Sequence, residues 1–204
     1  MPALKFSDGQ KDTLLKLARK VVEAQVTRKE ISGVEPCNDP ALSQPCGCFV
    51  TLHVDGLLRG CIGTFQASSP LWKTVIEIAK ASLDDPRFRG RPVLPSELGR
   101  LEIEISVLSV LEKTDDPLSL ELGVHGIYIS RDYHTGCFLP QVATEAGWSK
   151  EEFLSYCCSH KAGLPEDAWG DPKTDVYLFT AEVFSEKQLA GQRKSTAPVE
   201  DKKS

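Results

Sequence analysis

The residues with the clearest chemical potential lie in the stretch Leu58-Arg59-Gly60-Cys61-Ile62-Gly63. Glycine lacks a Cβ, so a ligand can approach the backbone closely beside Cys61. A nearby cation favours the thiolate, which is the nucleophilic and metal-binding form of cysteine. Strand alternation could place Arg59 and Cys61 on the same face. We therefore predict Cys61 and Arg59 as catalytic residues, with Gly60 and Gly63 shaping the backbone that binds the substrate.

An ordinary structural role for Cys61 is the competing interpretation. A cysteine between glycines in a strand is often a small core residue, and buried thiols are usually inert. The sequence therefore leaves two classes of protein open. One is an enzyme, or the substrate-handling subunit of an enzyme; the other is a non-catalytic binding or adaptor module in which Cys61 only fills space.

Three arginines alternate downstream, at Arg87, Arg89 and Arg91. Guanidinium groups suit phosphate and carboxylate recognition, and alternation could line them along one face. A solvated loop balanced by Asp84 and Asp85 is the alternative, because exposed charge pairs contribute little. We retain Arg87 as a predicted substrate-binding residue.

Histidines that could act as a general base for Cys61 are the next candidates. His125 and His134 lie in predicted turns, and His53 lies on a strand beside the one that carries the cysteine. No sequence spacing brings any of them to the sulfur. His125 is kept as a substrate-binding candidate together with Lys161, which could complete an anion site or simply favour a helix C-terminus.

Two cysteine groupings resemble fragments of a metal site. Cys46 and Cys48, with Cys37 upstream, are separated by one residue, whereas zinc sites use two to four and require a second pair. Cys157 and His160 share one face of a predicted helix, but further ligands are missing. We predict no metal and no cofactor.

Composition places the protein among ordinary globular chains. It has 204 residues, 41% hydrophobic and 26% charged, and a net charge of −5. A mildly acidic chain is not expected to coat nucleic acid nonspecifically, because that requires clustered cations, although a local basic pocket remains open. The apolar runs are far shorter than the roughly 18 residues of a membrane span.

The seven cysteines indicate a reducing compartment. Their number is odd, their spacing matches no small-domain disulfide framework, and the N-terminal stretch from Met1 to Lys5 does not resemble a signal peptide. We expect free thiols and a cytoplasmic protein.

Hydrophobic periodicity predicts an α+β fold, with a largely antiparallel sheet packed with helices. Ser7 and Gln10 form a capping box at the start of the first helix, and Asp55-Gly56 is a strong hairpin turn. We expect one domain over residues 7–186 and a disordered polar tail over 187–204. The further expected elements are strands at 48–54, 57–65, 101–107, 126–131, 137–139 and 176–183, and helices that begin at Ser69 and Ser149.

Several blocks of the chain together resemble the AMMECR domain family. They follow the family's order over residues 8–186 and consist of Leu58–Gly63, Asp84–Phe88, Leu101–Leu108, Leu139–Ala143, Gly147-Trp148 and Lys161–Leu164. The resemblance implies larger and smaller subdomains that form a cleft near the signature cysteine. After Phe88 this chain has Arg89-Gly90-Arg91 instead of an apolar, proline-rich continuation, so the inference is weakest in that loop.

The same resemblance implies a modification pathway. In many prokaryotes, members of this family are linked with a Memo-type protein and a radical S-adenosylmethionine protein. The implied substrate is RNA or another small or macromolecular compound. Family membership alone does not assign a reaction, so the chemistry has to be argued from the site.

Overall fold

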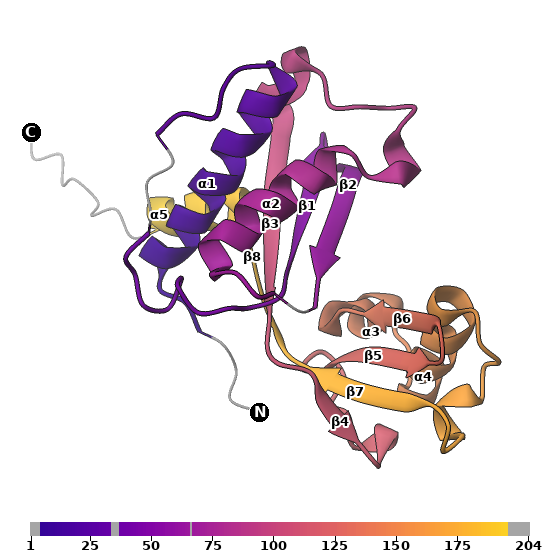
Figure 1. Ribbon diagram of the computed structural model, residues 1–204. Helices are drawn as coiled ribbons and strands as arrows, with labels where there is room; N and C mark the ends of the chain where they lie inside the picture. The colour runs from indigo at the N-terminus through magenta and orange to yellow at the C-terminus, as the bar shows by residue number, and fades with distance from the viewer. Residues whose placement is uncertain (1–4, 34–36, 66, 196–204) are drawn as a thin grey trace, which may run out of the picture. The chain divides into compact units, whose positions relative to one another are not determined.

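The computed structural model describes residues 5–33, 37–65 and 67–195, and it confirms the predicted α+β class. The chain forms two compact units (Figure 1). The larger contains the described residues of 6–106 and 183–195, and the smaller contains Val107–Glu182. Within these described residues the strands form two four-stranded sheets, ordered β2-β1-β3-β8 and β4-β7-β5-β6.

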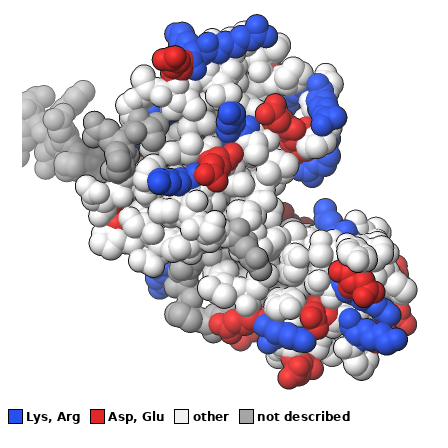
Figure 2. Space-filling model, in the orientation of Figure 1, with Lys and Arg blue, Asp and Glu red and all other residues white. Residues whose placement is uncertain are grey.

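Charged side chains of both signs are present on the surface (Figure 2). On the face that Figure 2 shows, acidic and basic side chains are interspersed and separated by wide uncharged areas. Across the described ranges, no helix combines the length and the apolar character that crossing a membrane requires.

The larger unit packs helices on one sheet. Figure 1 shows α1 and α2 on the same side of that sheet. Short 3₁₀ turns at Pro86–Phe88 and Pro95–Arg100 follow α2. The elements are α1 (Asp8–Val26), β1 (Cys48–Val54), β2 (Leu57–Thr64), α2 (Leu71–Leu83), β3 (Leu101–Leu108), β8 (Ala181–Ser185) and α5 (Glu186–Ser195).

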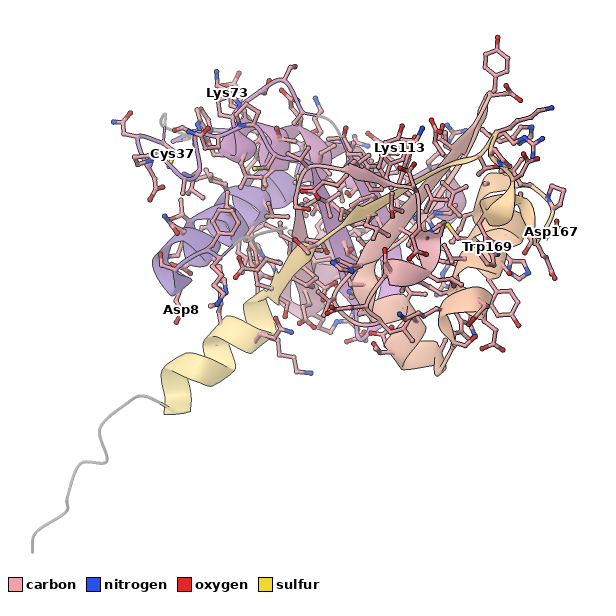
Figure 3. All side chains as sticks on the ribbon, turned by 90° about the horizontal axis from the view of Figure 1, so that it is seen from below. Asp8, Cys37, Lys73, Lys113, Asp167 and Trp169 are labelled. Atoms are coloured by element: carbon pink, nitrogen blue, oxygen red, sulfur yellow. The ribbon has the colours of Figure 1, made fainter. Side chains whose placement is uncertain are left out.

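Helix α1 begins where the sequence predicts. The Ser7 side chain accepts the Gln10 amide, and the Gln10 side chain accepts the Ser7 amide, so two otherwise unpaired helix donors are satisfied. Asp8, labelled in Figure 3, lies in the first turn, where the helix dipole favours a negative charge. The buried stripe of α1 includes Leu14, Leu15, Ala18, Val21 and Val22.

The β1–β2 hairpin turns at Asp55 and Gly56, as predicted. Both have positive φ, 53° and 79°, which a two-residue turn of this type requires. Alternate residues of β1 are buried, and the Ser82 hydroxyl of α2 donates to the Val50 carbonyl at 2.8 Å. One face of the hairpin is therefore packed on α2, and the other carries the remaining side chains.

The smaller unit has its own core. Phe153, Ile127 and Ile129 are fully buried in it, and Phe138 stacks on Phe153 with ring centroids 5.6 Å apart. Its elements are β4 (Glu112–Thr114), β5 (Gly126–Arg131), β6 (His134–Phe138), α3 (Pro140–Ala146), α4 (Lys150–Tyr156), a π-helical turn at Cys157–Ala162, and β7 (Asp175–Phe179).

Several expected boundaries differ from the structure; for example, the strand expected at 137–139 is β6, which begins at His134. The predicted strand 176–183 is divided into β7 and β8 at Thr180. The helix expected to be capped by Ser69 instead has Pro70 at its N-cap, without a side-chain hydrogen bond. The predicted disordered tail begins as helix α5, in which Leu189 is buried; residues 196–204 of that tail lie outside the described residues.

A substitution at Gly60 tests the packing of the hairpin on α2. A Cβ at this position would lie 2.0 Å from the Ser82 carbonyl oxygen, which is backbone and cannot turn aside. Gly60→Ala should therefore lower the free energy of unfolding by about 1–3 kcal/mol. Gly99→Ala is the control, because its added Cβ meets nothing within 4 Å. Urea unfolding followed by circular dichroism would measure both, and equal stabilities would contradict this packing.

Candidate functional site

A β-bulge sets the orientation of Cys61. Leu58 pairs with His53, but Gly60 pairs with Leu52, so Arg59 is an extra residue without a partner in the register. Beyond the bulge, Cys61 lies opposite a different β1 residue than the turn alone would dictate. The regular register would pair it with Val50, which is buried on the α2 side of the sheet.

The bulge instead pairs Cys61 with Thr51, on the face opposite to α2. The main-chain N–H and C=O of Cys61 point away from β1, so this is a non-hydrogen-bonded pair, whose side chains approach closely. The Thr51 hydroxyl donates to the Cys61 sulfur at 3.4 Å. Cys61 is partly exposed, which a reactive thiol requires.

A buried carboxylate binds the outward-facing backbone amide of Cys61. Strand β2 is an edge of its sheet, so no further strand receives the outward groups of Cys61. Asp85 Oδ2 accepts the Cys61 amide at 2.9 Å, and Asp85 Oδ1 accepts the Arg87 amide at 3.0 Å. The carboxylate of Asp85 thus joins the edge strand to the 3₁₀ turn that follows α2.

Arg87 supplies the second half of this connection. Its Nη2 donates to the Cys61 carbonyl at 2.9 Å and to Asp85 Oδ2 at 2.7 Å, and its Nε donates to Asp85 Oδ1 at 3.1 Å. The hydrogen bond from Arg87 lowers the pKa of Asp85 to about 2. The pKa of Arg87 is raised, first by its hydrogen bond with Asp85 and further by its interaction with Cys61. Arg87 is thus the cation beside this thiol.

The prediction that Arg59 stabilises the thiol is corrected by its contacts. Its guanidinium forms a two-pronged ion pair with Glu97, at 2.8 and 3.0 Å, and donates to the carbonyls of Arg91 and Pro92. None of these partners is the Cys61 sulfur. The physical reason is the bulge, because the extra residue breaks the alternation that the prediction assumed. Arg59 is a positioning residue that holds the bulge against the following loop, and its hydrogen bond keeps the pKa of Glu97 at about 2.

The predicted role of the two glycines also changes. The open side of Gly60 is filled by the Ser82 carbonyl, and that of Gly63 by the Phe49 ring, whose Cδ1 would lie 2.2 Å from an added Cβ. The lack of a side chain at these two positions is therefore explained by neighbouring protein atoms and not by a ligand. The Phe49 ring also meets Phe65 edge-on at 5.4 Å, which places an aromatic surface on the same face as Cys61.

The predicted histidines and Lys161 do not all lie in the unit that contains Cys61. His53 is two residues beyond Thr51 on β1, so it shares the face of Cys61, but no described hydrogen bond joins it to the sulfur. The others lie in the smaller unit. There, His125 Nδ1 accepts the Glu121 amide, His134 Nδ1 meets the Ala162 carbonyl, and Lys161 Nζ lies 5.4 Å from the centre of the Phe138 ring.

The seven cysteines, all within the described ranges, are free thiols, as predicted. Burial raises the pKa of Cys48 to about 12 and that of Cys158 to about 11, and it raises the pKa of Cys157 as well. These three are structural. Among the residues with assigned positions, no group of three or more His, Cys, Asp or Glu side chains could hold a metal ion.

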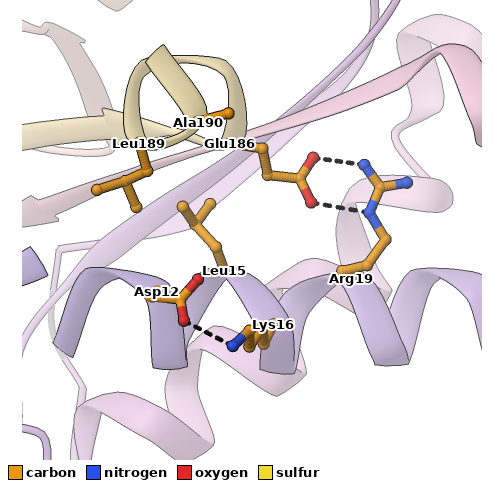
Figure 4. Close-up of a pocket in the computed structure, with 7 residues that line it drawn as sticks. All are labelled: Asp12, Leu15, Lys16, Arg19, Glu186, Leu189 and Ala190. Atoms are coloured by element: carbon orange, nitrogen blue, oxygen red, sulfur yellow. Dashed lines mark hydrogen bonds and ion pairs between the residues drawn. The ribbon is translucent and has the colours of Figure 1, made fainter. Parts of the chain in front are cut away.

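A pocket lies between α1 and α5 (Figure 4). It is lined partly by Arg19 and Glu186, which form an ion pair with each other, with Arg19 Nε 2.8 Å from Glu186 Oε1. Glu186 also accepts the Ile103 amide at 2.9 Å, and Arg19 donates to the Leu101 carbonyl at 2.7 Å. These polar groups satisfy one another and fasten α5 to the unit, so the pocket has a structural explanation.

Comparison with known proteins gives a consistent match. The AMMECR1 family model matches residues 15–184. A protein of Thermococcus gammatolerans is 40% identical over 200 residues, covering 92% of this chain and 95% of that protein. A protein of Methanothermobacter thermautotrophicus is 41% identical over 181 residues, covering 85% and 93%. The crystal structure of an uncharacterized protein from Pyrococcus horikoshii superposes with a TM-score of 0.80, at 39% identity, covering 92% and 96%.

These matches cover both units and include the hairpin that carries Cys61. The chain belongs to the AMMECR1 family. The predicted resemblance and the predicted α+β fold are both confirmed.

The lowered pKa of Asp85 makes a pH dependence of stability testable. A carboxyl whose folded-state pKa is about 2 stabilises the fold above its ordinary pKa and loses that contribution as the pH falls toward 2. Asp85→Asn should therefore cost more unfolding free energy at pH 6 than in acid, and the gap between the two conditions should approach about 2 kcal/mol as the lower pH nears 2. Urea titrations across this range would measure the gap. A gap that stays constant would show that Asp85 carries no stabilising charge.

Proposed function

We propose that this protein is an enzyme, or the substrate-handling subunit of one, and that Cys61 is the thiol that meets the substrate. The observation that carries the proposal is the set of polar groups around Cys61, whose sulfur is partly exposed. Thr51 donates a hydrogen bond to it, and the Arg87 guanidinium donates to the carbonyl of the same residue and is held by Asp85. A hydrogen-bond donor and a cation both stabilise sulfur in its negatively charged, nucleophilic form.

The pathway belongs to the same proposal. We infer a modification reaction on RNA or on another small or macromolecular substrate, in the cytoplasm. Partner proteins of the Memo type and of the radical S-adenosylmethionine type are proposed from the family resemblance. Copurification of either with the intact chain, followed by mass spectrometry, would support this part.

A binding or adaptor module is the second candidate, and one observation favours it. Gly60 and Gly63 are both explained by packing against Ser82 and Phe49, so two residues of the signature need no ligand. This reading makes the sulfur of Cys61 dispensable, whereas the proposed function makes it essential.

Thiol mapping tests the reactivity of the site. Cys61 should react with iodoacetamide faster than Cys48 and Cys157, because those two are fully buried. Thr51→Val should slow the reaction at Cys61 by about threefold to tenfold, because one hydrogen bond to the sulfur is lost. The rates are read from quenched samples by peptide mass spectrometry. Thr135→Val, an exposed strand position in the smaller unit, is the matched control and should leave the rate unchanged.

Replacing the sulfur in cells separates the two candidates. Cells that carry Cys61→Ser should lose the same small molecule or modified nucleoside as cells without the protein, because the serine retains the size but not the nucleophile. Untargeted comparison of metabolites and RNA nucleosides makes the measurement, with circular dichroism as the folding control. A folded Cys61→Ser protein that restores the complete wild-type profile would favour the adaptor module.

A further inference from the structure

The guanidinium of Arg87 is only partly used by the protein. Its Nε and Nη2 bind Asp85 and the Cys61 carbonyl, its Cζ lies 5.5 Å from the centre of the Phe88 ring, and the described hydrogen bonds include none from Nη1. The side chain is 58% exposed, whereas the carboxylate that holds it is only 1% exposed. A buried anchor therefore presents an oriented, solvent-facing pair of N–H donors.

The other arginines near the site are used differently. The Arg59 guanidinium donates hydrogen bonds to Glu97 and to two carbonyl groups, and its side chain is only 9% exposed. Arg89 is exposed and has no described side-chain hydrogen bond or ion pair, so nothing orients it. Of these three arginines, Arg87 combines a fixed orientation with an exposed guanidinium and a direct hydrogen bond to Cys61.

We infer that Arg87 binds a carboxylate or phosphate group of the substrate through Nη1 and thereby places the neighbouring reactive atom at the sulfur of Cys61. This inference rests on the proposed function and adds the class of substrate. Guanidinium groups bind both oxyanions through paired N–H donors, and an arginine that is already immobile loses less conformational freedom on binding. Asp85 keeps Arg87 in place, since breaking that pair would leave a buried carboxylate uncompensated.

The test uses two alkylating reagents that differ mainly in charge. Iodoacetate carries a carboxylate beside its reactive carbon, whereas iodoacetamide carries a neutral amide. In each reaction the sulfur forms a bond to carbon and iodide leaves. Arg87→Gln should lower the ratio of the iodoacetate rate to the iodoacetamide rate at Cys61 by about fivefold to tenfold, as expected for attraction between single charges at a partly exposed site.

Arg89→Gln is the matched control, since it removes an exposed arginine two residues away. Its rate ratio should stay within about twofold of the wild type if the effect is local and not a general change of surface charge. Arg87→Lys should give an intermediate ratio, because it retains the charge but loses the planar fork. Circular dichroism establishes that each variant is folded.

Protection of the unaltered protein provides a measurement that needs no variant. Inorganic phosphate or acetate should slow iodoacetamide at wild-type Cys61 relative to sodium chloride at equal ionic strength. Stronger protection by phosphate would indicate a phosphorylated substrate, and stronger protection by acetate a carboxylic acid.

The outcomes separate this inference from the proposed function. If Cys61 reacts with neither reagent, the thiol is not accessible and both fail. If Cys61 reacts readily with iodoacetamide, but neither anion protects it and Arg87→Gln leaves the rate ratio unchanged, the reactive thiol stands and anion recognition by Arg87 is overturned.

Discussion

The β-bulge at Arg59 is the constraint on which the candidate site depends. Side chains alternate along a strand, so one extra residue moves every later side chain to the other face. Here it turns Gly60 toward α2, where only glycine fits beneath the Ser82 carbonyl, and it turns Cys61 toward the opposite face. Without the bulge, the sulfur would be directed into the core.

Two ion pairs stabilise the backbone at and beside the bulge. Arg59 and Glu97 fasten the extra residue to the loop that follows α2. Asp85 and Arg87 occupy the outward backbone groups of Cys61, where a neighbouring strand would otherwise bind. The second pair thus prevents unwanted strand pairing at an exposed edge and also brings a guanidinium to the sulfur. Edge protection and the proposed thiol chemistry therefore involve the same two side chains.

Local patterns in the sequence predicted much of the fold. The Ser7 capping box, the Asp55-Gly56 turn and the alternation of β1 are each encoded within a few residues, and each is confirmed. The expected tail over residues 187–204 was wrong at α5, because Leu189 is buried there and Glu186, just before the tail, is bound by Arg19 and the Ile103 amide. A pattern of adjacent residues does not contain such contacts.

The site was only partly predictable for the same reason. Cys61 and Arg87 were identified from residue type, but Thr51 and Asp85 were missed. A regular two-residue hairpin would place Thr51 opposite Gly60, so its contact with Cys61 depends on a bulge that the sequence pattern did not reveal. Asp85 had a usable signal, because an aspartate directly before Pro86 often caps a turn through its side chain. Its burial against Cys61 was a tertiary contact and had no such signal.

The pairing of Cys61 is the feature to measure, because the bulge and the orientation of the sulfur both follow from it. In a non-hydrogen-bonded antiparallel pair, the two Hα atoms face each other closely. Nuclear Overhauser spectra of the intact protein should therefore show a strong contact between the Hα atoms of Thr51 and Cys61. Spectra that place Val50 opposite Cys61 would mean that the strand is regular and that the sulfur points toward α2, and the account would then be wrong.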